Sequence, residues 1–242
     1  MTIIVFSDID DTLIQSKRKC LGIDIAQVTA TNKDSKSSSF STIEQLHLYN
    51  WFNNENLIPV TGRGKEAFER ISLSFNSYKV INHGAIILNK ENVLDEEWNT
   101  LIKRETQRWG RVLQQYFQEL LDFIDQRKLV LRCRLVDEFG YKCYISIKGN
   151  HNDLLKLSTI TERFLALPDN TRLHFNDQNM ALLPPYTCKK RAVEFLQEKH
   201  RKADPNTLFI GVGDSNSDLN FMSSCHFQML PTNSQINREK LQ

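Results

Sequence analysis

The 242-residue chain lacks the usual marks of a secreted, membrane-bound or nucleic-acid-binding protein. Its five cysteines are irregularly spaced without a C-x-x-C pair, which argues against a disulfide framework or zinc site and favours reduced thiols. No apolar run approaches a membrane span, and no basic and apolar leader precedes the first predicted strand. The formal net charge is only +2, so nothing demands an anionic partner. We expect a cytoplasmic protein with no membrane or nucleic-acid partner, and the sequence indicates no particular oligomeric state.

The most informative segment is Thr2–Leu13, in which a run of apolar, β-branched residues ends in three carboxylates. The run predicts a buried strand. Crowded negative charge at its end is costly unless a cation or hydrogen-bond donors compensate it. Asp8 and Asp10, two residues apart at a strand end, therefore indicate a divalent-metal site at the carboxyl edge of a parallel sheet.

A hydroxyl and a second group of carboxylates follow two further predicted strands. The apolar run Leu57–Val60 ends in Thr61 and in a glycine turn that begins at Gly62. The run Thr207–Gly213 ends in the acidic segment Asp214–Asp218. These polar groups occupy analogous strand ends in a β/α alternation, so we expect them to meet at one edge of the sheet.

A lysine is expected at the same edge. The amphipathic stretch that follows Cys188 predicts a helix, and Thr187 is expected to be its N-cap. Lys189 stands at the start of this helix, with Lys190 the next-best candidate. A basic run is also typical of a solvated helix start, and that interpretation stays open.

In this order, the four groups resemble the motifs of the haloacid dehalogenase superfamily of phosphohydrolases. The first motif, D-x-D-x-T, matches Asp8–Thr12, and the second, a Ser or Thr that ends a strand, matches Thr61. The third, a lysine that opens a helix, matches Lys189, and the fourth, G-D-x-x-x-D, matches Gly213–Asp218. The T-G-R form of the second motif is common in the branch with a large cap. The resemblance spans nearly the whole chain.

The resemblance implies hydrolysis of a phosphomonoester through an aspartyl-phosphate. Asp8 would be the nucleophile, and Asp10 would protonate the leaving alcohol and then activate water. Thr61, Gly62 and Lys189 would bind the phosphate oxygens.

The same resemblance implies Mg²⁺ as the cofactor. Its ligands would be Asp8, Asp214 and an oxygen at the Asp10 position, such as the backbone carbonyl. Three residues that do not ligate the ion directly would orient Lys189 or a metal-bound water: Asp218, Ser215 and Ser217. Two departures stand out. Many members with a large cap have glycine where this chain has Asp11, which adds negative charge. Ser217 stands where the family commonly has asparagine.

Between the second and third motifs, residues 89–184 predict a cap with the order αββαββ. This order resembles the compact type-two cap of the superfamily, found in phosphatases of sucrose, trehalose and mannosylglycerate phosphates and in broad-specificity, Cof-like members. The expected elements are a helix over residues 98–127, strands over 129–136 and 141–148, a helix over 154–167, and strands over 172–175 and 180–183. We therefore expect an α/β fold, a doubly wound, Rossmann-like parallel core of residues 1–88 and 185–242 with an inserted α+β cap at 89–184.

Three smaller features complete the expectations. Residues 15–41 predict a flap beside the active site, and its serine-rich part predicts a mobile loop. The basic residues of the flap are either solvated loop charges or groups that attract anionic substrates. The helix from Thr42 is expected to pack its apolar residues in the core. Asn82-His83-Gly84 resembles the N-G-A turn of the superfamily with His83 inserted, either a turn residue or a group facing the site.

The expected substrate is a small phosphorylated metabolite, namely a sugar or polyol phosphate. This expectation rests on the cap type alone. A phosphomutase or phosphotransferase, with a sugar hydroxyl in place of water, is the nearest alternative. A DxD glycosyltransferase would have no use for Lys189 or the Asp214 cluster. A non-enzymatic sugar-phosphate sensor is disfavoured because every expected catalytic position is filled.

Overall fold

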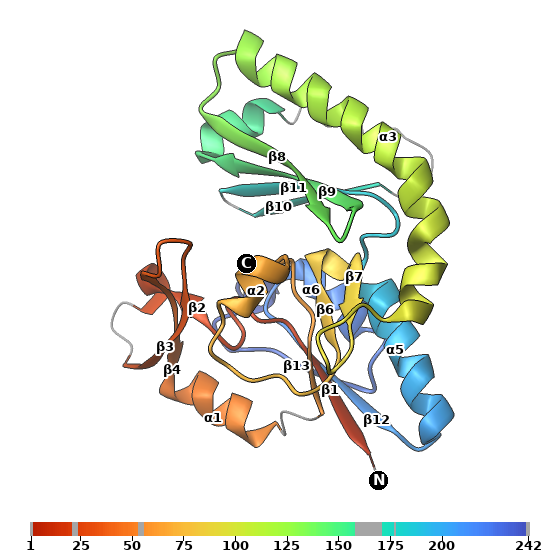
Figure 1. The fold of residues 1–242 in the computed structure, drawn as a ribbon. Coiled ribbons are helices and arrows are strands. Elements are labelled where there is room, and N and C mark those ends of the chain that lie inside the picture. The colour runs from red at the N-terminus through yellow and green to blue at the C-terminus, as the bar shows by residue number, and fades with distance from the viewer. Residues whose placement is uncertain (1, 21–23, 53–55, 158–170, 177, 241–242) are drawn as a thin grey trace. The chain divides into compact units, whose positions relative to one another are not determined.

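A computed structural model of the chain describes residues 2–20, 24–52, 56–157, 171–176 and 178–240. The chain divides into two compact units (Figure 1). The first unit comprises Met1–Trp98 and Lys189–Gln242, and the second comprises Asn99–Cys188. Residues 89–98 thus fall with the first unit and residues 185–188 with the second.

The first unit is built on a parallel four-stranded sheet with the strand order β13-β12-β1-β5. β1 (Ile3–Ser7) pairs with β12 (Leu208–Val212) on one side and with β5 (Leu57–Pro59) on the other. β13 (Phe227–Met229) continues the sheet beyond β12. Parallel strands joined through helices confirm the predicted α/β fold class.

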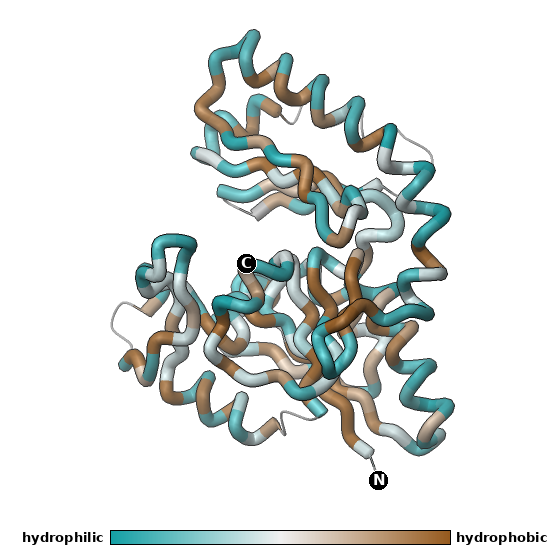
Figure 2. The backbone as a smooth tube through the Cα atoms, in the orientation of Figure 1, coloured by the Kyte–Doolittle hydropathy of each residue, from teal (hydrophilic) through white to brown (hydrophobic). Residues whose placement is uncertain are grey.

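The central strands form the core of this unit because their side chains are apolar. Ile4, Val5 and Phe6 of β1 are buried, and the ring of Phe6 lies 6.0 Å from that of Phe209 in β12. Figure 2 shows hydrophobic residues concentrated along these strands. The carboxyl ends of the strands carry the polar residues.

The remaining elements of the first unit connect and cover the sheet. α5 (Lys189–Ala203) buries Ala192, Val193 and Leu196 on one face, as its amphipathic pattern predicts. The helices and 3-10 turns are η1 (Lys17–Cys20), α1 (Ile43–Trp51), α2 (Lys65–Glu69), η2 (Asn82–Gly84), α6 (Asn216–Met222) and α7 (Gln235–Lys240). The further strands are β2 (Gln15–Ser16), β3 (Ile25–Thr31), β4 (Ser37–Thr42), β6 (Lys79–Ile81) and β7 (Ile86–Leu88).

The serine-rich segment is only partly a loop. Residues 32–36 form the turn between β3 and β4, but the prediction is wrong for the serines that follow. β2, β4 and β3 form a three-stranded antiparallel sheet, and Ser37–Ser39 lie within β4. Ser39 and Ser41 are buried, and the Ser41 hydroxyl donates to the Leu13 carbonyl oxygen at 2.8 Å. Pairing with neighbouring strands here outweighs the weak strand preference of serine.

Two expectations about helix ends and faces are also wrong. Ile43 and Trp51 of α1 are 44% and 69% exposed, because the apolar residues of this helix are spread around its circumference. Phe52, directly after the helix, is buried as expected. Thr187 is not the N-cap of α5, because the helix begins at Lys189 and Cys188 is the residue before it. The Thr187 hydroxyl donates to the Cys143 carbonyl oxygen at 2.5 Å.

The second unit combines a long helix with an antiparallel sheet. α3 (Glu96–Gln126) runs into it from Trp98 and alternates hydrophobic and hydrophilic residues along its length (Figure 2). The sheet has the order β10-β11-β9-β8. Its strands are β8 (Leu131–Glu138), β9 (Tyr141–Gly149), β10 (Arg172–Asn176) and β11 (Asn179–Leu183).

The four strands predicted for this unit pair as two antiparallel hairpins, β8–β9 and β10–β11. The β8–β9 turn places Phe139 and Gly140 at φ 54° and 79°, the left-handed region that tight hairpin turns require. Residues 151–157 are helical, and the rest of the helix predicted over 154–167 lies outside the described residues. None of the helices in the described ranges has the length and apolarity to span a bilayer.

Candidate active site

Three polar strand ends meet at one edge of the parallel sheet. Ser7 of β1 is in register with Val212 of β12 and with Pro59 of β5. The Asp8 N–H donates to the Val212 carbonyl oxygen at 2.9 Å. Asp8, Asp214 and Thr61 therefore follow neighbouring strands at the same carboxyl edge.

Lys189 links two of these carboxylates. Its Nζ donates to Oδ1 of Asp8 and to Oδ1 of Asp218, each at 2.7 Å. Asp8 and Asp218 are buried, the latter completely, and the side chain of Lys189 is 11% exposed. Burial alone would lower the pKa of Lys189, but Asp218 and Asp8 raise it above its ordinary value. Lys189 is thus a permanent cation at the base of the site, whereas Lys190 forms an exposed pair with Glu194.

Asp8, Asp214 and Asp218 form a buried acidic cluster whose oxygens lie within 4.8 Å of one another. Burial, reinforced by neighbouring aspartates, raises the pKa of Asp8 well above its ordinary value despite Lys189. Burial and the carboxylates of Asp218 and Asp11 raise the pKa of Asp214 to about 7. One lysine does not neutralise this cluster, and hard carboxylate oxygens are the donors that Mg²⁺ prefers. The residues present therefore fit a magnesium ion.

Asp218 also caps the N-terminus of α6 together with Ser215. Its Oδ2 accepts from the Ser215 N–H at 3.1 Å and from the Ser215 hydroxyl at 2.6 Å. The Ser215 and Ser217 hydroxyl oxygens are 2.8 Å apart. A Cβ added to Gly213 would lie 2.6 Å from Cβ of Asp218, so only glycine allows this close approach. The Asp218 carboxylate thus both completes the capping box of α6 and holds Lys189.

Asp10 lies apart from the acidic cluster, in a pair with Arg63. Arg63 donates from Nη2 to Oδ1 of Asp10 at 2.7 Å and from Nε to Oδ2 at 2.9 Å. The Arg63 N–H donates to the Thr61 hydroxyl at 3.1 Å. Arg63 thus ties the side chain of Asp10 to the turn that contains Thr61 and Gly62. Sequence reasoning did not assign Arg63 a role, although the T-G-R motif contains it.

Asp11 faces another cation. Its φ of 63° lies in the left-handed region, where glycine is favoured and where many relatives were expected to have glycine. The Asp11 carboxylate pairs with Nζ of Lys19 in η1. Lys19 lowers the pKa of Asp214 while Asp11 raises it, so the added carboxylate comes with its own countercharge.

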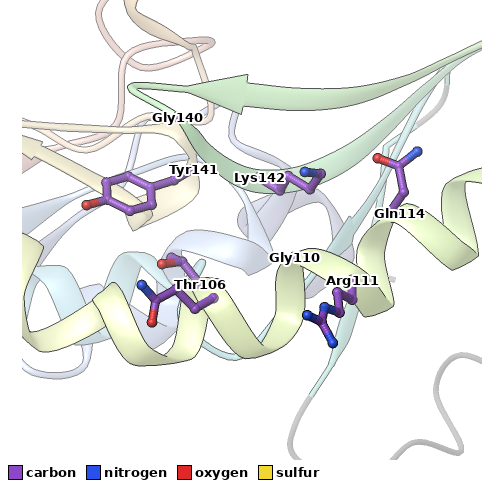
Figure 3. A pocket seen from close by; sticks show the side chains of 8 residues that line it. Thr106, Gly110, Arg111, Gln114, Gly140, Tyr141 and Lys142 are labelled. Carbon is purple, nitrogen blue, oxygen red and sulfur yellow. The ribbon is translucent and has the colours of Figure 1, made fainter.

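A separate pocket lies within the second unit, between α3 and the β8–β9 turn (Figure 3). Its volume is about 520 Å³. Polar and basic side chains line it: Thr106, Gln107, Arg111, Gln114, Tyr141 and Lys142. Because none of the four motifs contributes to this pocket, it lacks the carboxylate–lysine arrangement that distinguishes the strand edge of the first unit.

The sequence model of the sucrose-6F-phosphate phosphohydrolase family matches residues 1–235 of this chain. A search of curated proteins finds no match.

Three solved structures resemble the whole fold. The sucrose-phosphatase of Synechocystis sp. PCC6803, in complex with sucrose and phosphate, is 18% identical with a TM-score of 0.52, over 100% of this chain and 87% of that one. A Thermoplasma acidophilum protein is 13% identical with a TM-score of 0.54, over 100% and 90%. The C-terminal domain of the C. albicans trehalose-6-phosphate phosphatase is 11% identical with a TM-score of 0.57, over 92% and 73%. At these identities the structures support the fold alone.

Proposed function

Since this chain belongs to the sucrose-6F-phosphate phosphohydrolase family, we propose that it hydrolyses a small sugar phosphate with Mg²⁺ through an aspartyl-phosphate on Asp8. Family membership makes the chain a phosphatase and confirms the resemblance carried by its four motifs. The observation that supports the mechanism best is the double contact of Lys189 with Asp8 and Asp218 at the strand edge.

Asp8 is the proposed nucleophile. Its carboxylate follows β1, and Lys189 holds Oδ1, so the other oxygen remains for attack on phosphorus. Attack forms an acyl phosphate and expels the sugar alkoxide. Lys189 would also bind the equatorial phosphate oxygens, where negative charge accumulates in the transition state. Asp218 holds Lys189 in position by accepting a hydrogen bond from its Nζ.

The proposed metal ligands are Asp8 and Asp214, with an oxygen from the Asp10 position. A magnesium ion held there would supply positive charge against the doubly negative phosphate and the buried carboxylates. Asp218 is engaged by Lys189 and Ser215, which suits a supporting role better than a ligand role.

Asp10 is the proposed acid and base, and Arg63 its positioning partner. Both oxygens of Asp10 accept a hydrogen bond from Arg63, and each keeps a second lone pair that could carry the proton for the leaving alcohol. Asp10 would then take a proton from the water that hydrolyses the aspartyl-phosphate. Thr61 and the Gly62 N–H are the proposed phosphate donors on this side of the site.

Sugar phosphates are the proposed substrate class. Similar structures include a sucrose-phosphatase that holds sucrose and phosphate and a trehalose-6-phosphate phosphatase. We assign substrate choice to the predicted cap of residues 89–184, which overlaps the compact unit Asn99–Cys188, because no catalytic motif lies in it.

A screen of phosphorylated metabolites with purified protein tests this function. Sucrose and trehalose phosphates, hexose phosphates and polyol phosphates would each be offered with Mg²⁺, and free phosphate measured. We expect release from a sugar phosphate that EDTA abolishes and Mg²⁺ restores, with inhibition by Ca²⁺ because its looser coordination would let both Asp8 oxygens bind the ion. Full activity in excess EDTA contradicts the mechanism. Phosphate transfer to an added sugar would instead indicate a phosphotransferase, and binding without turnover a sensor.

A further inference from the structure

The turn between β6 and β7 has an unusual backbone. Asn82, His83 and Gly84 have φ values of 51°, 55° and 95°, so three successive residues lie in the left-handed region. Two of them are not glycine and adopt this conformation at a cost in backbone energy. Such conformations persist where the surrounding structure fixes them, and they concentrate at functional sites.

Hydrogen bonds attach this turn to both sides of Gly62. The His83 N–H donates to the Thr61 carbonyl oxygen at 2.9 Å, and the Asn82 N–H donates to the Arg63 carbonyl oxygen at 2.8 Å. The T-G-R turn and the turn at His83 thus form one rigid assembly beside the strand ends. β6 adjoins β5 through the bridge between Val60 and Val80, which places the two turns at the same edge.

The imidazole of His83 lies directly against Gly62. A Cβ added to Gly62 would be 2.5 Å from Nε2 and 2.9 Å from Nδ1 of His83, closer than real Cβ contacts allow. A side chain at position 62 would therefore displace the ring of His83. His83 as a whole is partly exposed.

We propose that His83 is a phosphate-contacting residue, whose imidazole N–H donates a hydrogen bond to a non-bridging oxygen of the bound phosphomonoester. The inference rests on the proposed function, which uses Thr61 and Gly62 as phosphate donors. The strained turn holds the ring beside that pair, and the imidazole would add a side-chain donor to the Gly62 N–H. His83 would thus complete the phosphate site beside Thr61 and Gly62.

His83→Asn tests this assignment, because asparagine tolerates the left-handed backbone while removing the imidazole. We expect the KM for a sugar phosphate and the Kd for orthophosphate with Mg²⁺ to rise together by roughly tenfold to a hundredfold, as for loss of a hydrogen bond to a charged group. The kcat should change much less. His47→Asn, at an exposed position of α1, is the matched control and should leave all three unchanged. A folded His83→Asn variant with the wild-type orthophosphate Kd overturns the proposal.

A second measurement uses the unmodified chain. Orthophosphate with Mg²⁺ should slow the reaction of His83 with diethyl pyrocarbonate, followed by peptide mass, and should leave His47 equally reactive. Equal reactivity of His83 with and without orthophosphate overturns the assignment. Both tests measure phosphate binding, so they stand even if no sugar phosphate is hydrolysed, a result that would overturn the proposed function instead.

Discussion

The guanidinium of Arg63 binds both carboxylate oxygens of Asp10, at 2.7 and 2.9 Å. The Asp10 side chain is half exposed, while that of Arg63 is largely buried. A planar fork of donors fixes a carboxylate in one plane, which a lysine cannot do. Arg63 thus determines how the carboxylate of the proposed acid and base is oriented.

Replacing Arg63 should impair the leaving-group step. We expect Arg63→Lys to lower kcat/KM for a sugar phosphate by roughly 10- to 100-fold, because Asp10 loses its fixed orientation. An aryl phosphate, whose leaving group needs little protonation, should be affected much less. Steady-state kinetics with both esters measure the difference. An equal loss with both esters would show that Arg63 acts on the phosphate and not through Asp10.

Removing Lys189 should destabilise the fold as well as abolish activity. Lys189→Met leaves the buried carboxylates of Asp8 and Asp218 without their cation, which we expect to lower the free energy of unfolding by roughly 3–5 kcal/mol. Adding Asp218→Asn should recover part of this stability but none of the activity.

Lys190→Met is the matched control for this experiment. Lys190 forms an exposed pair with Glu194, and such pairs contribute about 0.5 kcal/mol or less. Denaturant unfolding of the three variants at neutral pH provides the comparison. A larger effect of Lys190→Met than of Lys189→Met would reverse the assignment of the two lysines.

The raised pKa of Asp214 predicts a pH-dependent effect of Mg²⁺ on stability. Burial and nearby carboxylates raise this pKa from 3.8 to about 7, so between these pH values the folded state binds more protons than the unfolded state. The contribution of Asp214 to stability is therefore greatest below pH 4 and is lost as the pH rises to about 7. A cation bound to the ionised carboxylate offsets this loss.

We accordingly expect Mg²⁺ to raise the Tm more at pH 8 than at pH 6. Asp214→Asn should flatten the pH dependence of the metal-free protein and reduce the response to Mg²⁺ at both pH values. Thermal unfolding monitored by circular dichroism, with and without the ion, measures both effects. An identical rise in Tm at pH 6 and pH 8 in the wild-type chain is incompatible with Asp214 as a ligand.

The sequence predicted the strand edge well because its signals are local. Each apolar run ends in its polar group within a few residues, and parallel strands bring those ends together, as Asp8 and Asp214 show. The contact of Lys189 with Asp218 follows from the same topology, since α5 and α6 pack together.

The features that sequence reasoning missed depend on contacts between distant segments. Arg63 pairs with Asp10 across 53 residues, and no local pattern indicates which carboxylate it binds. β4 is a strand because β2 and β3 pair with it, although its serines favour loops. His83 acquires its place only when the turns after β5 and β6 are joined by hydrogen bonds.

The central claim is that Asp8 becomes phosphorylated and that Asp10 does not. Asp10→Asn keeps the nucleophile but removes the acid and base, so turnover of a sugar phosphate should fall on the order of 10²–10⁴-fold. With an aryl phosphate it should still form the phosphoenzyme, which then accumulates because no base activates water. Asp8→Asn should form none.

Intact-protein mass after rapid quench with an aryl phosphate and Mg²⁺ distinguishes the two aspartates directly. We predict one phosphate adduct on the Asp10→Asn variant and no adduct on the Asp8→Asn variant. An adduct on the Asp8→Asn variant, or equal turnover of sugar and aryl phosphates by the Asp10→Asn variant, would contradict the assignment.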